Sequence, residues 1–131
     1  MKTGKILIVE GDIMLSEMLE TQLGKDGYIV SSRQTGEKAI EELKKGPVDL
    51  LIISTNLRGE MDGFSLVKAI RKDPGLASTP IVVDSSKPGI KEVMRKMGVV
   101  CFIEKPFDIG DLRKSICGAL KKNDHTNMDV M

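Results

Sequence analysis

Residues 6–10 are Ile-Leu-Ile-Val-Glu, four consecutive apolar residues followed directly by an acid. Such a run suits a strand that is covered on both faces, as in a parallel sheet, because successive side chains of a strand point to opposite faces. Three further runs are bounded by turn residues: Leu50–Ile53, Ile81–Val83 and Val99–Ile103. A weaker fifth run lies within Tyr28–Arg33 and suits a strand at the sheet edge.

Helical patterns fill the gaps between the apolar runs, and their apolar stripes are expected to face the core. The stripes are formed by Met14, Leu15, Met18, Leu19 and Leu23; Ala39, Ile40 and Leu43; Phe64, Val67 and Ile70; Ile90, Val93, Met94 and Met97; and Ile109, Leu112, Ile116 and Leu120. Strand and helix therefore alternate five times, and right-handed crossovers place helices on both faces of one sheet. The sequence predicts an α/β fold: a single doubly wound (βα)5, flavodoxin-like three-layer sandwich with strand order 2-1-3-4-5.

The length of 131 residues fits one domain. We expect the domain to occupy residues 1–122, because the apolar pattern stops after Lys122, and residues 123–131 to form a flexible tail or the start of a linker. No apolar run approaches the roughly 20 residues that cross a bilayer, so no membrane span is predicted. A net charge of +1 gives no general attraction to nucleic acid. The spacing of Cys101 and Cys117 matches no metal motif, and free thiols imply the cytoplasm.

Doubly wound sheets bind ligands beyond the carboxyl ends of their strands. Polar and charged residues follow four of the predicted strands at this edge. They are Glu10, Gly11 and Asp12 after the first strand; Ser54 at the end of the third; Asp84, Ser85, Ser86 and Lys87 after the fourth; and Lys105, Pro106 and Phe107 after the fifth. We expect the functional site among these residues.

Over residues 5 to about 121 the chain resembles the receiver domain of bacterial two-component response regulators. The resemblance rests on four segments in order: residues 6–10; residues 49–53 followed by Asn56-Leu57 and Met61-Asp62-Gly63-Phe64; residues 80–87; and residues 102–107. It implies an aspartate at the end of the third strand that accepts a phosphoryl group from a histidine kinase. It also implies two acids that help bind Mg²⁺, a hydroxyl and an aromatic residue that report phosphorylation, and a lysine that neutralises the phosphoryl group.

Several positions of this pattern are kept. Glu10 stands at the first acidic position, and Asn56 stands where a backbone carbonyl would bind the metal. Ser85 and Phe102 stand at the two switch positions. Lys105 stands at the lysine position, and the Lys105-Pro106 bond corresponds to the family's cis peptide, an isomer essentially confined to X–Pro bonds.

Two central members of the pattern are missing. Ser54 occupies the phosphoacceptor position, and Gly11 occupies the second acidic position. A serine hydroxyl is not ionised at neutral pH and needs an adjacent general base, whereas a carboxylate is already charged. Losing two of three formal negative charges also weakens the attraction for a cation. We therefore expect neither Mg²⁺ nor another cofactor to bind, and no acyl phosphate to form.

Other acids lie near this pattern. Asp12 and Asp62 each precede a helical stripe and are expected to cap a helix, and Asp12 belongs with Glu10 to the residual acidic pocket. Glu60 and Asp84 are acids at unusual positions for the family. Whether Glu60, Asp62 or Asp84 restores the charge of the pocket stays open. Structural roles are also open for Ser85 as a turn residue, for Phe102 as fixed core and for Lys105 as the ion-pair partner of Glu10.

The predicted function is that of a degenerate receiver, a pseudo-receiver, that is not an enzyme and acts by protein–protein interaction in bacterial signalling. Its partner would be a signalling protein or a second copy of the chain. Either would dock on the fourth helix, fifth strand and fifth helix, where Lys87, Lys91, Arg95 and Lys96 form a basic strip.

Two alternatives remain open. The first is a working Mg²⁺-dependent phosphorelay receiver with rerouted chemistry. The second is a flavodoxin-like nucleotide or flavin binder, which the carboxylates after the first strand disfavour because they repel phosphate. DNA binding is not expected, because no helix-turn-helix pattern follows the fifth helix.

Overall fold

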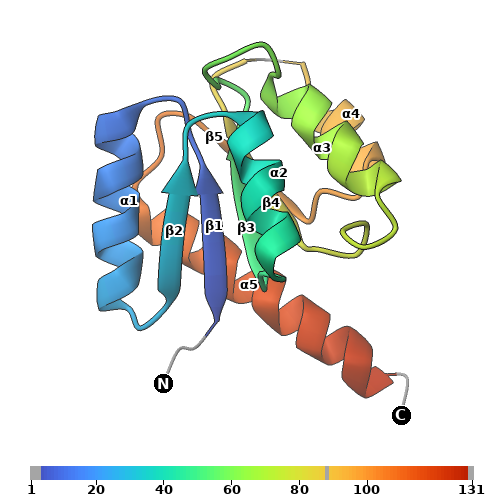
Figure 1. Cartoon of the computed structure of the whole chain (residues 1–131). Coiled ribbons are helices and arrows are strands. Elements are labelled where there is room, and N and C mark those ends of the chain that lie inside the picture. The colour runs from blue at the N-terminus through green and yellow to red at the C-terminus, as the bar shows by residue number, and fades with distance from the viewer. Residues whose placement is uncertain (1–3, 88, 130–131) are drawn as a thin grey trace.

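Five parallel strands form the central sheet in the order β2-β1-β3-β4-β5 (Figure 1). The computed structural model describes residues 4–87 and 89–129, and side chains as far as residue 120. The strands are β1 (Lys5–Val9), β2 (Ile29–Arg33), β3 (Leu50–Ser54), β4 (Ile81–Ser85) and β5 (Cys101–Glu104). The predicted strand order is confirmed, and β2 lies at the sheet edge, as its weaker apolar run indicated.

Helices cover both faces of the sheet. They are α1 (Ile13–Lys25), α2 (Gly36–Lys45), α3 (Gly63–Lys72), α4 (Lys91–Lys96) and α5 (Ile109–Asp129). Side chains of α1 and α5 pack in one core cluster, and side chains of α2, α3 and α4 pack in the other. This arrangement confirms the three-layer, doubly wound architecture.

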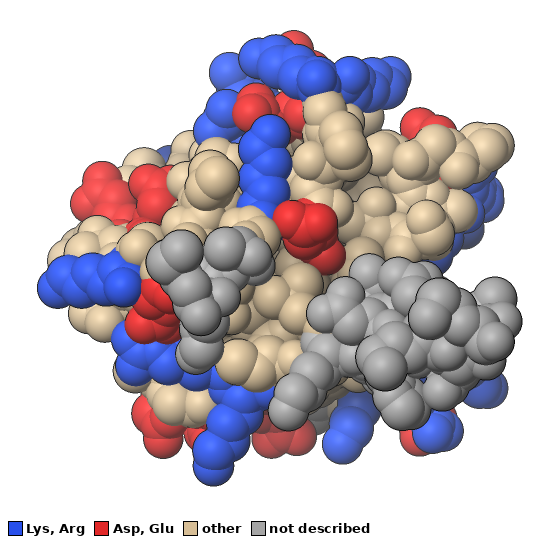
Figure 2. All heavy atoms as spheres, turned by 90° about the horizontal axis from the view of Figure 1, so that it is seen from below, with Lys and Arg blue, Asp and Glu red and all other residues tan. Residues whose placement is uncertain are grey.

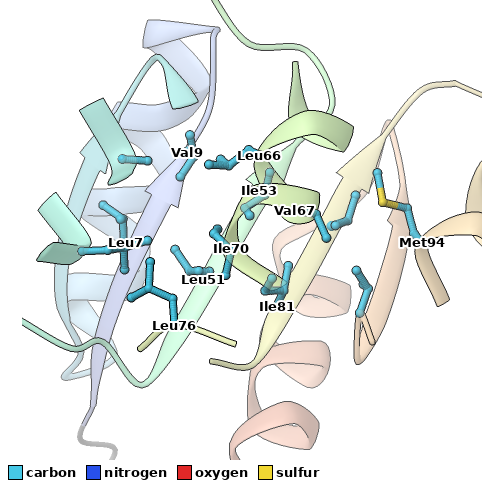
Figure 3. Close-up of a cluster of buried hydrophobic side chains, with 14 residues drawn as sticks. Leu7, Val9, Leu51, Ile53, Leu66, Val67, Ile70, Leu76, Ile81 and Met94 are labelled. Atoms are coloured by element: carbon cyan, nitrogen blue, oxygen red, sulfur yellow. The ribbon is translucent and has the colours of Figure 1, made fainter. Parts of the chain in front are cut away.

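Alternation along the strands decides which core each residue joins. Figure 3 shows the cluster toward α2, α3 and α4, where Leu7, Leu51 and Ile81 lie with every second residue of their strands. The intervening residues, such as Ile8 and Ile52, face α1 and α5. Side chains two apart in a strand share a face. The row of side chains that faces α1 and α5 therefore continues past the apolar part of each strand. The polar residues that continue it are Glu10 after Ile8, Ser54 after Ile52 and Asp84 after Val82.

The fourth strand is longer than the sequence indicated. We expected Asp84 and Ser85 to follow this strand, but both belong to it, because Asp84 pairs with Ile103 and Ser85 pairs with Glu104 of β5. Pairing with β5 therefore holds Asp84 in a strand, with its side chain fixed relative to its neighbours in the sheet.

Not every residue of the apolar stripes is buried. Met14 is 82% exposed, and Met18, Phe64 and Val93 are also exposed. Their prediction as core residues is wrong, because the stripe on each helix is wider than the face that the sheet covers.

Helix α5 continues to Asp129, beyond Lys122 where the apolar pattern ends. Once a helix is nucleated, each further residue adds one backbone hydrogen bond, so a helix can continue beyond the residues that pack against the sheet. The boundary at residue 122 stays a prediction, and residues 130–131 lie outside the described residues. None of the helices, as far as they are described, is long and apolar enough to span a membrane.

Candidate functional site

Four side chains converge at the carboxyl edge of the sheet: Glu10, Ser54, Asp84 and Lys105. Ser54 pairs directly with Asp84 across β3 and β4, and Glu10 follows Val9, which pairs with Ile53. Lys105 follows β5 and reaches back over this edge. Glu10, Ser54 and Asp84 are each only 1% exposed. Residues far apart in the sequence therefore meet where a doubly wound sheet is expected to hold its ligand.

The ammonium group of Lys105 is the centre of this cluster. Its Nζ donates to Glu10 Oε1 at 2.8 Å and to Ser54 Oγ at 3.3 Å. It also lies 3.3 Å from Asp84 Oδ1, which has no hydrogen bond among the described residues, so this second attraction is ionic. We call Glu10, Asp84 and Lys105 the buried charge triad.

Asp84 decides the charge of the pocket, which the sequence left open. We expected Glu10 and Asp12 to form the residual acidic pocket, but Asp12 is exposed and caps α1. Asp84 adds a second carboxylate, because β4 extends far enough to place it beside Ser54. The triad therefore carries one net negative charge when both acids are ionised.

Burial and neighbouring charges change the pKa values of the triad. Burial raises the pKa of Asp84 to about 6; Lys105 opposes this shift and Glu10 adds to it. Burial alone lowers the pKa of Lys105, but the hydrogen bond that Lys105 donates to Glu10 and the charges of Asp84 and Glu10 outweigh burial, so the net pKa is raised. Lys105 thus stays charged at neutral pH. Asp84, with a pKa of about 6, titrates just below neutral pH.

The backbone closes the space beside Gly11. Gly11 N donates to the carbonyl oxygen of Asn56 at 3.1 Å, and Arg58 Nε donates to the carbonyl oxygen of Gly11 at 2.9 Å. A Cβ at position 11 would lie 2.5 Å from Asn56 O, closer than real Cβ atoms approach. A second acid at this position therefore does not fit unless the loop before α3 moves.

The remaining acids near the site point elsewhere. Asp12 is exposed and caps α1, accepting from the backbone N–H groups of Met14 and Leu15 at 3.0 and 3.2 Å. Asp62 caps α3, and the hydrogen bond from the backbone N–H of Ser65 lowers its pKa. Glu60 is exposed in the loop before α3. Of the three acids left open by the sequence, Asp84 alone joins the triad.

The two switch positions lie on the opposite side of the sheet from the triad. The Ser85 hydroxyl is hydrogen-bonded to the Thr55 hydroxyl and accepts from Lys87 N at 2.9 Å. Phe102 is half-buried and packs against the core toward α2, α3 and α4. Thr55, which the sequence did not single out, therefore fixes Ser85 in the present arrangement.

The bond between Lys105 and Pro106 is cis, as the resemblance implied. The residues of the predicted basic strip, Lys87, Lys91, Arg95 and Lys96, are all exposed. Arg95 forms an ion pair with Glu92 at 2.8 Å, so part of the positive charge of the strip is compensated locally.

Comparison with known proteins identifies the family. The family model of the response regulator receiver domain matches residues 6–117. The chain belongs to this family. It is therefore a receiver domain of two-component response regulators.

Individual relatives of this receiver domain are distant. The uncharacterized transcriptional regulatory protein YkoG of Bacillus subtilis is 26% identical over 99% of this chain and 57% of its own length. The transcriptional regulatory protein GlrR of Escherichia coli is 30% identical over 93% of this chain and 27% of its own length. The chain thus spans only part of these curated relatives.

A solved structure has the same fold. The chemotaxis response regulator CheY4 of Vibrio cholerae superposes with a TM-score of 0.83 and 27% identity, covering 91% of this receiver domain and 100% of that chain. The flavodoxin-like receiver fold is thereby confirmed by a structure as well as by the family model.

Proposed function

We propose that this receiver domain is a pseudo-receiver that acts by protein–protein interaction without phosphorylation and is not an enzyme. The observation that carries the proposal is Ser54, with Lys105 Nζ 3.3 Å from its Oγ. The backbone N–H of Asn56 is a second donor, 3.1 Å from the same oxygen. Neither group takes a proton from the hydroxyl, and the described residues around it include no histidine. Asp84, the adjacent carboxylate, turns its Oδ1 toward Lys105, and a serine that no base deprotonates is a weak nucleophile.

The same proposal excludes Mg²⁺ from the resting site. Both carboxylates of the buried charge triad turn an oxygen toward Lys105, and Asn56 O accepts from Gly11 N. Among the described side chains, no group of three or more acids, histidines or cysteines is arranged to hold a metal ion. Mg²⁺ demands near-ideal octahedral oxygen ligands, and a fixed ammonium group beside the carboxylates repels it. This donor set does not fit the ion that the family implies.

Treatment with acetyl phosphate and Mg²⁺ tests the proposal. We expect the intact mass of the wild-type chain to stay unchanged, because Ser54 lacks the charge of a carboxylate. The Ser54→Asp variant is the matched comparison, since it restores an acid at the same strand end. A modified variant beside an unmodified wild type assigns the loss to position 54. If neither is modified, the closed backbone at Gly11 also blocks the reaction. Phosphorylated wild type contradicts the proposal.

A second candidate function rests on Asp84. This acid lies beside Ser54 in the sheet register, which is the place for either an alternative phosphoacceptor or a base acting on Ser54. It would make the chain a working phosphorelay receiver with rerouted chemistry. A mass gain that hydroxylamine removes, and that Asp84→Asn abolishes, supports an acyl phosphate on Asp84. A hydroxylamine-stable gain supports a seryl phosphate.

The proposed partners follow from the family and from surface charge. Receiver domains interact with signalling proteins such as kinases and effector domains. We propose a signalling protein, or a second copy forming a homodimer, on the face of α4, β5 and α5. Figure 2 shows the edge of the sheet at the amino ends of the strands, opposite the buried charge triad, where Lys and Arg are interspersed among Asp and Glu. Mixed charge offers no phosphate-binding surface on that face, and nucleic acid is not among the partners that we propose. The proposed location is the cytoplasm.

A further inference from the structure

A groove of about 700 Å³ lies between α3 and α4. Its apolar part is formed by Phe64, Val93 and Met97. Phe64 is 38% and Val93 is 42% exposed, although both belong to the apolar stripes of their helices. Large apolar side chains that gather in one hollow, instead of being scattered singly, mark interaction sites. We call this hollow the α3–α4 groove.

The edges of the α3–α4 groove are basic. Lys68 and Lys72 of α3 and Lys96 of α4 line it, and all three are exposed. None of these three lysines forms an ion pair with a described residue. Among the residues whose side chains are described, none that lines the groove is acidic. An apolar strip between unpaired positive charges is complementary to a segment that is apolar on one side and acidic at its margins.

One residue holds the groove in shape. The guanidinium of Arg71 donates to the carbonyl oxygens of Met97 and Gly98 at 2.8 Å and to those of Ala77 and Thr79 at 2.9 Å. It thereby ties the C-terminal end of α4 to α3 and to the loop before β4. A groove that is formed in advance loses less conformational entropy when a ligand binds.

We propose that the α3–α4 groove binds an acidic, amphipathic helical segment of a partner protein. A helix laid between two helices places residues at i, i+3, i+4 and i+7 against Phe64, Val93 and Met97. Acidic residues flanking this stripe then face Lys68, Lys72 and Lys96. The inference rests on the proposed function as an interaction module, and it requires nothing about the phosphorylation of Ser54.

The test uses the full chain and a synthetic peptide of roughly 16 residues with Leu at i, i+3, i+4 and i+7 and Glu between them. We expect the peptide to shift the backbone amide signals of α3 and α4 in NMR spectra. Reversing two rim charges, Lys68→Glu with Lys72→Glu, is expected to weaken binding at least about tenfold. Reversing two exposed lysines of α2, Lys38→Glu with Lys44→Glu, is the matched control and is expected to leave binding within about twofold.

A peptide of the same composition with its leucines scattered is expected to bind at least about tenfold more weakly, because its apolar residues no longer share one helical face. Equal binding to the wild type and to the Lys68/Lys72 variant overturns the inference, as do signal changes confined to other elements. Self-association of the wild-type chain also overturns the inference if the Lys68/Lys72 variant abolishes it, because a second copy of the chain then fills the groove. If the peptide does not bind and acetyl phosphate also leaves the wild-type chain unmodified, the groove inference fails and the proposed function stands.

Discussion

Replacing Lys105 with methionine is expected to destabilise the fold by about 3–5 kcal/mol at pH 7, the usual cost of removing one partner from a buried ion pair. The substitution keeps an unbranched apolar stem but leaves Glu10 and Asp84, each 1% exposed, without their counter-charge. Urea denaturation, followed by circular dichroism, measures the loss.

An exposed lysine provides the control for this variant. Lys91→Met is expected to change the free energy of unfolding by no more than about 0.5 kcal/mol, as surface substitutions usually do. The deficit of Lys105→Met is expected to shrink near pH 4, because Asp84 is then protonated and needs no counter-charge. A loss below about 1 kcal/mol at pH 7 would show that the triad is not a buried electrostatic unit.

Asp84→Asn is expected to stabilise the domain at pH 8 by up to about 3 kcal/mol, because a rise of about two pKa units corresponds to that free energy. Burial raises the pKa of Asp84 from 3.8 to about 6, so the folded state binds the proton more tightly than the unfolded state does. The contribution of this group to stability is therefore fully present below pH 3.8 and is lost as the pH rises through 6. An amide carries no charge, so the variant avoids this loss.

The measurement is the free energy of unfolding of both chains from pH 4 to pH 8. We expect the two curves to approach one another at the acidic end and to separate as the pH rises. Glu41→Gln, at an exposed position of α2, removes a carboxylate without changing the triad and is expected to follow the wild type. An Asp84→Asn variant less stable than the wild type at pH 8 would mean that Lys105 stabilises the Asp84 charge more than burial opposes it.

Much of the fold could be predicted from the sequence. Consecutive apolar runs such as Leu50–Ile53 are long enough and regular enough to indicate buried parallel strands, and turn residues mark their ends. The positions of Glu10, Ser54 and Lys105 at the carboxyl edge follow from that topology. Glu10 and Ser54 follow neighbouring strands, whereas Lys105 follows β5 and reaches both residues across β4 through its long side chain.

The place of Asp84 in the triad is not evident from its residue type, although an acid is unusual at this position. The signal that could have found it is alternation: Val82 and Asp84 repeat the pattern of Ile52 and Ser54 on the next strand. The sequence predicts an end of the fourth strand at Val83, because an acid rarely occupies the buried end of a strand. A strand extended by two residues would have placed Asp84 beside Ser54.

The loop contacts could not be predicted from residue types alone. The hydrogen bonds from Gly11 N to Asn56 O and from Arg58 Nε to Gly11 O depend on the path of the loop before α3. Such a path is decided by many weak contacts and not by apolar periodicity. The exposure of Phe64 and Val93 likewise depends on how far apart α3 and α4 lie, which sequence periodicity does not give.

The central claim is that the ammonium group of Lys105 takes the place of a metal ion in the pocket. A Mg²⁺ titration of the wild-type chain, followed by amide NMR, tests this claim most directly. Up to about 20 mM MgCl₂, we expect the signals of Glu10, Ser54 and Lys105 to change no more than they do in NaCl of equal ionic strength. Saturable changes at these residues with Mg²⁺ alone would contradict the claim, because they would show a metal ion binding beside Lys105.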